Sequence, residues 1–226
     1  MCGRYTLKRP RRVRLEGLDD NELFSVLPRY NIAPSQEVLA VRETGEKRSF
    51  SMLHWGLIPS WSAKPVGFIN ARAETLQTKP SFREAFEKRR CLIPADGFYE
   101  WEKLGKERQP YYFQMKDEAP FCFAGIWDEW QRGGVSITSC AIITTTPNEM
   151  LAPIHNRMPV ILRSEDQDTW LRSNAKPQEL KDLLAPLSAN EMKRHPVSSD
   201  VNHPKIDDEH LVSPVEPNLG VTGSLF

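Results

Sequence analysis

Residues 91–102 read C-L-I-P-A-D-G-F-Y-E-W-E, which is two short β-forming runs joined by a turn. The runs at 91–93 and 98–102 are rich in aromatic and β-branched residues, and Asp96-Gly97 between them is a turn signal. Because side chains alternate along a strand, Glu100 lies on the face opposite to that of its two aromatic neighbours. The stretch therefore predicts two strands and places one carboxylate among apolar side chains.

The same pattern of short strands continues on both sides of this stretch. Further strands are predicted at 37–42, 49–55, 110–115, 121–127, 139–145 and 159–162. Helices are fewer: a capping box of Ser81 and Glu84 opens one over 81–90, Ser164 with Gln167 opens one through 171, and others are expected at 21–27, 177–184 and 188–191. We predict one α+β domain over residues 1–226, with a mostly antiparallel, partly barrel-like β core, a few peripheral helices and an irregular tail from about residue 199.

Composition limits the classes of protein that this chain can belong to. Of its 226 residues 39% are hydrophobic, enough for a folded core, and no apolar run approaches the roughly 18 residues of a membrane span. Four widely spaced cysteines and five unpaired histidines argue against a disulfide framework, a metal site or a cofactor. With no secretory signal visible, we expect a cytoplasmic protein, associated with the nucleoid if it is bacterial.

Net charge does not identify a partner, because thirty basic residues balance thirty acidic ones. Residues 1–14, however, hold six lysines and arginines and no acid. This segment is either a local nucleic-acid-binding patch or a solvated basic arm, and composition leaves both interpretations open.

The chain begins Met1-Cys2-Gly3-Arg4. Initiator methionine is removed when the next side chain is small, which would leave Cys2 with an α-amine near pKa 8 and a thiol near 8.5. Such an aminothiol condenses with an aldehyde to an imine and then closes to a thiazolidine. In the alternative interpretation, Met1 stays or Cys2 is an ordinary small residue at the start of a buried strand.

Other segments contain the groups that aldehyde capture requires: R-Y-N-I-A-P at 29–34, W-G-L-I-P-S-W at 55–61, I-N-A-R-A-E-T at 69–75, P-A-D-G-F-Y-E-W at 94–101 and I-H-N-R-M-P at 154–159. Each alone has an ordinary explanation as core, turn or loop. Together they supply a buried carboxylate (Glu100) and a histidine (His155) for proton transfer, an amide to hold the amine, arginines for phosphate, and a tryptophan to stack on a base.

With these motifs, in this order, and with M-C-G-R at its start, the chain resembles the SRAP family, the SOS-response-associated peptidases regarded as abasic-site processing proteins. The resemblance runs to about residue 198 and implies an α+β fold and a DNA-damage role. It implies that Cys2 forms a thiazolidine crosslink with the ring-opened sugar of an abasic site in single-stranded DNA, and that Asn70, Glu100 and His155 are the other active-site residues.

The resemblance also implies how DNA is held. Arg4, Arg72 and Arg157 match arginines that contact the DNA backbone, and Trp61 lies in a loop that wedges the strand in relatives. Relatives often carry two adjacent aromatic residues there, whereas Trp61 lies between two serines. We expect a monomer without metal, cofactor or membrane. Enzymatic release of the crosslink, a lyase side reaction and a peptidase or hydrolase activity stay open.

Two rival functions remain at this stage. Glutamine amidotransferases also begin Cys-Gly after methionine removal, so an N-terminal-nucleophile amidohydrolase is one alternative. A noncovalent single-stranded DNA-binding protein that uses arginine and tryptophan surfaces is the other.

Overall fold

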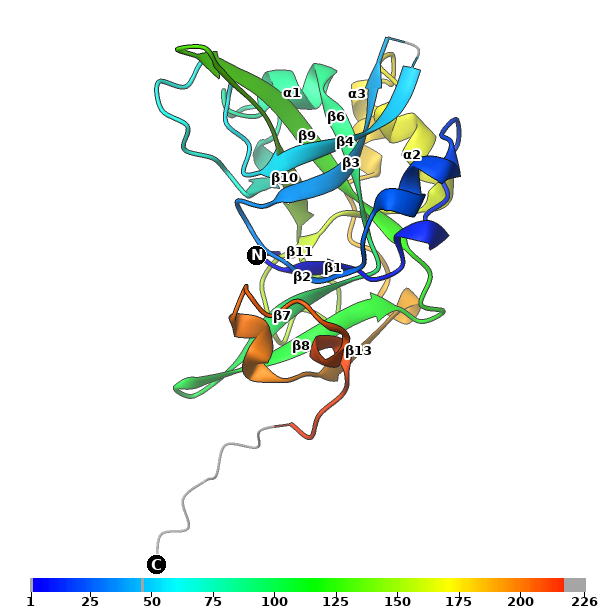
Figure 1. Cartoon of the computed structure of the whole chain (residues 1–226), viewed down its shortest axis with the longest axis vertical. Coiled ribbons are helices and arrows are strands. Elements are labelled where there is room, and N and C mark those ends of the chain that lie inside the picture. Colours follow the sequence, from blue (N-terminus) through cyan, green and yellow to red (C-terminus); the bar gives the residue numbers. More distant parts are fainter. Residues whose placement is uncertain (1, 46, 218–226) are drawn as a thin grey trace, which may run out of the picture.

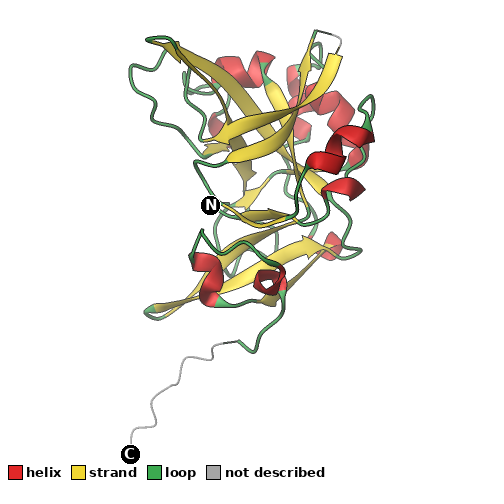
Figure 2. Cartoon of the chain, in the orientation of Figure 1, coloured by secondary structure: helices red, strands yellow, loops and turns green. Residues whose placement is uncertain are grey.

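The computed structural model describes residues 2–45 and 47–217 and has the single-domain α+β architecture that the sequence predicts (Figures 1 and 2). The strands are β1 (Tyr5–Leu7), β2 (Arg29–Ile32), β3 (Glu37–Thr44), β4 (Lys47–Trp55), β5 (Asn70–Arg72), β6 (Arg90–Ala95), β7 (Gly97–Leu104), β8 (Glu107–Met115), β9 (Phe121–Arg132), β10 (Val135–Thr145), β11 (Met158–Pro159), β12 (Ile161–Leu162) and β13 (Met192–Pro196). The α-helices are α1 (Arg83–Lys88), α2 (Ser164–Leu171) and α3 (Pro177–Asp182). The 3₁₀ helices are η1 (Pro10–Arg12), η2 (Asp20–Ser25), η3 (Ala73–Thr75), η4 (Ala189–Glu191), η5 (Ser199–Asn202) and η6 (Glu209–Val212).

The described strands form a five-stranded and an eight-stranded sheet. The first is antiparallel, in the order β13-β8-β7-β1-β2. The second runs β11-β10-β4-β3-β6-β9-β12 with β5 beside β10, and pairing of β9 with β10 closes it into a barrel. In this eight-stranded sheet β10 runs parallel to β4 and to β5. All other strand pairs of the sheet are antiparallel. The prediction of a mostly antiparallel, partly barrel-like core is confirmed.

Apolar side chains fill the spaces between these layers. One cluster joins the barrel to the five-stranded sheet and contains Cys2, Tyr5, Trp55 and Phe123. A second lies between the barrel and α1–α3, which gather along the top and right of the molecule in Figure 1. A third packs the C-terminal segment against the outer face of the five-stranded sheet, through Tyr99 and other residues.

The chain passes from one sheet to the other at the turn predicted from the sequence. β6 belongs to the barrel and β7 to the five-stranded sheet, so the crossing is at Asp96. The Asp96 carboxylate accepts hydrogen bonds from the Thr6 hydroxyl at 2.6 Å and from the Arg9 backbone N–H at 2.8 Å. Gly97 allows close packing, because a Cβ there would lie 2.0 Å from the phenolic oxygen of Tyr112.

Some local predictions need correction. The capping box of Ser81 and Glu84 is wrong: α1 starts at Arg83, and its N-cap is Phe82, whose side chain has no hydrogen-bond acceptor. The Arg83 N–H instead donates to the Lys79 carbonyl of the preceding turn. Ser164 is the first residue of α2 and does not cap it. The helices expected at 21–27 and 188–191 are 3₁₀ turns at Asp20–Ser25 and Ala189–Glu191, and the sequence did not predict β1, β2, β5 or β13.

The segment after residue 198 is more ordered than predicted, because the side chain of a buried asparagine forms hydrogen bonds with its backbone. Asn31, on β2, donates from Nδ2 to the carbonyls of His203 at 3.1 Å and Ile206 at 2.7 Å. Asp207 accepts in return from the Asn31 backbone N–H at 2.9 Å. These bonds hold the segment between η5 and η6 on β2, and Leu211 of η6 packs in the third cluster.

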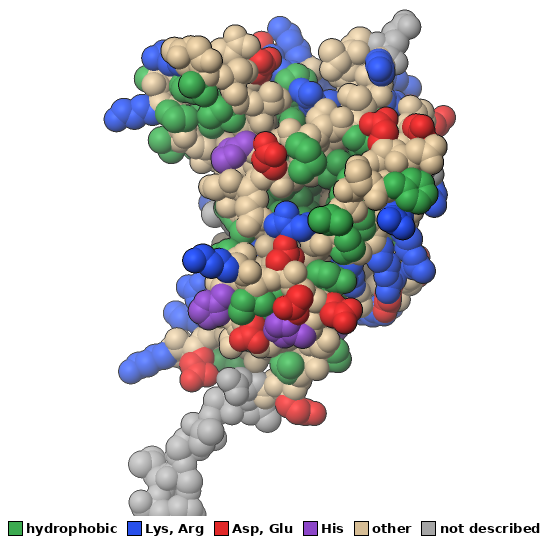
Figure 3. Space-filling view, viewed as in Figure 1, with side chains coloured by type: hydrophobic (Ala, Val, Ile, Leu, Met, Phe, Trp, Pro, Cys, Tyr) green, Lys and Arg blue, Asp and Glu red, His purple; other side chains and the backbone are tan. Residues whose placement is uncertain are grey.

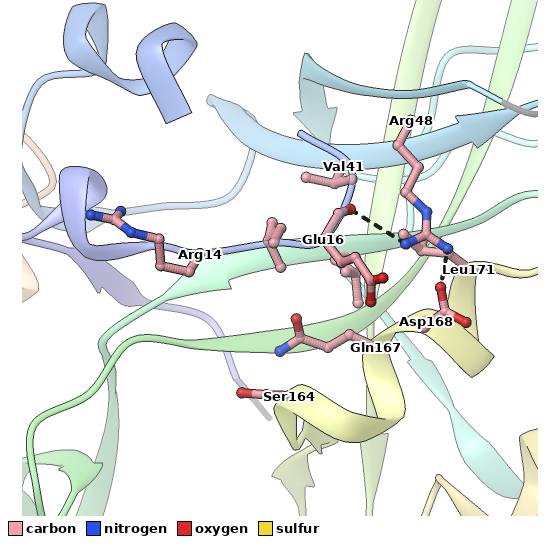
Figure 4. A pocket seen from close by; sticks show the side chains of 10 residues that line it. Arg14, Glu16, Val41, Arg48, Ser164, Gln167, Asp168 and Leu171 are labelled. Atoms are coloured by element: carbon pink, nitrogen blue, oxygen red, sulfur yellow. Dashed lines mark hydrogen bonds and ion pairs between the residues drawn. The ribbon is translucent and has the colours of Figure 1, made fainter. Parts of the chain in front are cut away.

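A cavity of about 240 Å³ between the N-terminal segment and α2 is crossed by Arg48 (Figure 4). Its guanidinium pairs with Glu43 at 3.0 Å and with Asp168, and donates to the Glu16 carbonyl at 3.4 Å. The described residues that line this cavity include none of the predicted site residues. Its polar groups join the N-terminal segment, β3 and α2, which indicates a structural role.

We expect Arg48→Ala to lower the free energy of unfolding by about 1–3 kcal/mol, because two carboxylates lose a half-buried charged donor. Urea unfolding followed by tryptophan fluorescence measures this loss. The matched control is Arg163→Ala, which removes an exposed pair with Glu191 and should cost under about 1 kcal/mol. Equal losses in the two variants would show that the Arg48 bonds add no special stability.

Candidate active site

Cys2 lies three residues before β1, in the apolar cluster that joins the two sheets. Its side chain is fully buried, and its backbone carbonyl accepts a hydrogen bond from Asn70 Nδ2 at 2.8 Å. Burial raises the pKa of the Cys2 thiol well above its ordinary value, and the nearby Glu100 carboxylate raises it further. The sulfur is therefore a neutral thiol at neutral pH and needs a base before it can act as a nucleophile.

Asn70 comes to Cys2 from the barrel. The three-residue strand β5 pairs in parallel with β10, which places Asn70 beside Ile142. The Nδ2 atom of Asn70 donates to the Cys2 backbone carbonyl. Its Oδ1 atom is buried and has no hydrogen-bond partner among the described residues. A buried acceptor without a donor costs about 1–3 kcal/mol, so this oxygen is suited to receive an N–H or O–H from a ligand or from the reacting amine.

Glu100 comes to the site from the five-stranded sheet. It lies on β7, with Phe98 in the cluster shared with Cys2 and Tyr99 in the cluster on the opposite face, which confirms the predicted alternation. The Glu100 side chain is only 3% exposed. Burial raises its pKa, and His155 nearby opposes part of that rise. A carboxyl group of this kind holds a proton at a higher pH than an exposed glutamate does.

His155 lies in the loop between β10 and β11. Successive turns stiffen this loop: Leu151 donates to Asn148, His155 donates to the Leu151 carbonyl at 2.9 Å, and Arg194 donates to the Met150 carbonyl at 3.0 Å. The Nδ1 atom of His155 accepts the Arg157 backbone N–H at 3.0 Å. Since Nδ1 is an acceptor, the neutral ring carries its proton on Nε2.

The four predicted active-site residues therefore reach one place from separate parts of the fold. The N-terminal segment provides Cys2, β5 provides Asn70, β7 provides Glu100, and the loop after β10 provides His155. Cys2 and Glu100 are buried, whereas Asn70 and His155 are half-buried. A nucleophile, two proton carriers and an amide brought together in this way are equipped for covalent capture of an electrophile.

Comparison with known proteins identifies the family of this chain. The family model described as SOS response associated peptidase (SRAP) matches residues 1–204. This chain belongs to the SRAP family. The abasic site processing protein YoaM of Bacillus subtilis is 42% identical over 94% of this chain and 97% of its own length. YedK of Escherichia coli, also named an abasic site processing protein, is 31% identical over 95% of this chain and all of its own.

A solved structure shares the fold of this SRAP chain. A crystal structure of a protein from Bacteroides thetaiotaomicron superposes with a TM-score of 0.83, at 27% identity over 95% of this chain and all of that one. The fold of this SRAP protein is therefore shared over nearly its full length.

The arginines predicted to contact DNA differ in how accessible they are. Arg72 is exposed at the end of β5. One guanidinium nitrogen of Arg4 already donates to Asn31 Oδ1 at 2.8 Å and to the Val201 carbonyl at 2.9 Å. Arg157 is only 11% exposed and forms a bidentate ion pair with Glu74. Arg72 is thus the most accessible of the three.

Trp61 lies outside the cluster around Cys2, on the loop between β4 and β5. Its side chain is 62% exposed, and Val66 and Phe68 on the same loop are also exposed. Asp128 accepts from the Ser60 N–H and Trp130 donates to the Ser62 carbonyl, each at 2.9 Å, so the turn that holds Trp61 is anchored. In Figure 3 apolar side chains gather at the upper left, where this loop lies in Figure 1.

Sequence reasoning missed polar residues beside the site. Glu74 is the ion-pair partner of Arg157, and the buried Thr144 hydroxyl has no hydrogen-bond partner among the described residues. Thr144 pairs in register with Arg72, two positions beyond the Asn70–Ile142 pair on the same strands. The available signal for Glu74 was its place in the I-N-A-R-A-E-T motif, two residues after Arg72.

Within residues 2–45 and 47–217, no group of three histidine, cysteine, aspartate or glutamate side chains is arranged to hold a metal ion. None of the helices in this part combines the length and apolar character needed to cross a lipid bilayer.

Proposed function

We propose that this protein captures abasic sites in single-stranded DNA, as a monomer, by forming a thiazolidine between Cys2 and the ring-opened sugar. The observation that carries the proposal is the convergence of the half-buried Asn70 and His155 on the buried Cys2 and Glu100. The names of the relatives, which are abasic site processing proteins, support it.

The reaction begins after removal of Met1, when the Cys2 amine attacks C1′ of the sugar aldehyde. The nitrogen loses both of its protons, the former carbonyl oxygen gains two protons and leaves as water, and an imine remains. Sγ then adds to C1′, its proton passes to the ring nitrogen, and the five-membered ring closes. One water is lost overall, and no oxidant or reductant is needed.

Glu100 and His155 carry the protons in this sequence. Because burial raises the pKa of Glu100, its carboxyl group can donate to the departing oxygen and its carboxylate can accept from the thiol. The thiol needs this base because its own pKa is raised. Every step is reversible, so the same two groups also serve release of the DNA, and the imine stage permits a slow lyase reaction.

The direct test uses an oligonucleotide with one abasic site and a denaturing gel. The proposal predicts a shifted band that survives boiling. An oligonucleotide whose abasic aldehyde has been reduced to an alcohol is the control, and it should give no band. A shift that appears only in native gels would support noncovalent binding instead.

We expect Arg72→Ala to weaken binding of all single-stranded sequences alike. A phosphate contact releases counterions without reading bases, so the slope of log K against log salt should fall by about 0.7. The measurement is fluorescence anisotropy with an intact strand over a range of salt concentrations. Arg108→Ala, at an exposed position on β8, is the control and should leave the slope unchanged. An unchanged slope in Arg72→Ala would remove Arg72 from the DNA path.

A further inference from the structure

Glu74 and Arg157 form a well-defined pair next to the site. Arg157 donates from one terminal nitrogen to Glu74 Oε1 at 2.6 Å and from the other to Oε2 at 2.9 Å. The second nitrogen also donates to the Thr144 carbonyl of β10. The bidentate bond holds the pKa of the Glu74 carboxyl below its usual value, so this group is ionised at neutral pH.

These bonds leave Arg157 little with which to bind a phosphate. Both terminal nitrogens are engaged, and Nε is buried without a hydrogen-bond partner among the described residues. The Arg157 side chain is 11% exposed, whereas that of Glu74 is 50% exposed. The more exposed Glu74 carboxylate, bonded directly to the guanidinium, repels a phosphate, because like charges repel.

The backbone of Arg157, in contrast, acts directly on the site. Its N–H donates to Nδ1 of His155 at 3.0 Å. An imidazole nitrogen that accepts a hydrogen bond carries no proton, so this single bond selects the tautomer of the neutral ring. The bond depends on the position of the backbone at Arg157, and the Arg157 side chain is fixed by Glu74 and β10.

We propose that Glu74 is a positioning residue. Its bidentate contact with Arg157 fixes the 155–157 turn, and the turn keeps the His155 proton on Nε2. In this arrangement Arg157 serves the chemistry through its backbone, while Arg72 provides the open phosphate contact. The part of this inference that concerns reaction rate rests on the function proposed above, whereas the tautomer of His155 does not.

Glu74→Gln is the central variant, since it keeps the shape of the side chain but removes the charge that holds Arg157. We expect the crosslinking rate at saturating DNA to fall about tenfold, as the turn loosens by a fraction of an ångström. DNA affinity and its salt slope should change less than about twofold, since the phosphate contacts lie elsewhere. Glu191→Gln, at an exposed pair with Arg163, is the matched control and should change neither quantity.

Nitrogen NMR of the histidine rings tests the structural half of the inference. In the unaltered protein, the neutral form of the His155 ring should show an unprotonated Nδ1 and a protonated Nε2, and in Glu74→Gln the two signals of the neutral form should move toward a tautomer mixture. A protonated Nδ1 in the neutral ring of the unaltered protein would overturn the inference, even if the variant does not fold. So would a variant that crosslinks at the normal rate, or one whose loss lies only in affinity and salt slope. Absence of any crosslink in the unaltered protein would instead count against the proposed function.

Discussion

Replacing Cys2 with serine should abolish the DNA adduct that survives denaturation, while noncovalent binding of the strand persists. The α-amine remains and still reaches the imine stage, but a hydroxyl closes the ring less readily and the product opens more easily. The Cys2 side chain is fully buried, its backbone carbonyl is held by Asn70, and Glu100 lies near enough to influence the thiol. In the proposed reaction, sulfur is the atom that closes the ring.

A denaturing gel after incubation with an abasic oligonucleotide measures this loss, and fluorescence anisotropy measures binding. Cys122→Ala provides the matched control, because Cys122 is also buried but lies in the cluster beside the helices. That control should crosslink normally. A stable adduct with Cys2→Ser would show that sulfur is not required, and the amine alone would then have to account for capture.

Replacing Glu100 with glutamine should slow crosslinking on the order of a hundredfold, because general acid–base catalysis contributes effects of that size. Glutamine keeps the volume and polarity of the side chain but cannot carry a proton from the thiol or to the departing oxygen. Single-turnover kinetics with a quenched denaturing gel give the rate. Glu102→Gln is the control, since Glu102 shares the strand face but is more exposed, and it should react at the normal rate.

The same variant should be more stable than the unaltered protein above the ordinary glutamate pKa of 4.5. A carboxyl group whose pKa is raised on folding stabilises the fold while protonated, and this contribution is lost as the pH rises through the folded pKa. The difference between the Tm of Glu100→Gln and the Tm of the unaltered protein should therefore shift in favour of the variant as the pH increases from 4.5. A constant Tm difference, or an unchanged crosslinking rate, would contradict the role given to Glu100.

Much of the fold follows from local sequence. Strands such as β7 and β9 could be predicted because aromatic and β-branched residues alternate between turn residues over a full strand length. The three residues of β1 and of β5 are too short for such a pattern and become strands only because neighbours pair with them. Closure of the barrel, through β9 and β10, depends on long-range pairing that no local window contains.

Some features of the candidate site could likewise be predicted from local sequence, and others depend on long-range contacts. Alternation along 98–102 predicted the face of Glu100, and the structure adds the reason for its raised pKa, which is burial between two sheets. The pairing of Arg157 with Glu74 joins residues 83 positions apart and could not be inferred from spacing. Arg4 was predicted to contact DNA, yet it is partly engaged by Asn31 and the C-terminal segment.

Intact mass spectrometry before and after incubation with an abasic oligonucleotide tests the central claim most directly. The account predicts a starting mass that lacks the initiator methionine, and a product heavier by the oligonucleotide less one water. Retention of methionine at the N-terminus, or an unchanged protein mass after incubation, would contradict capture by Cys2.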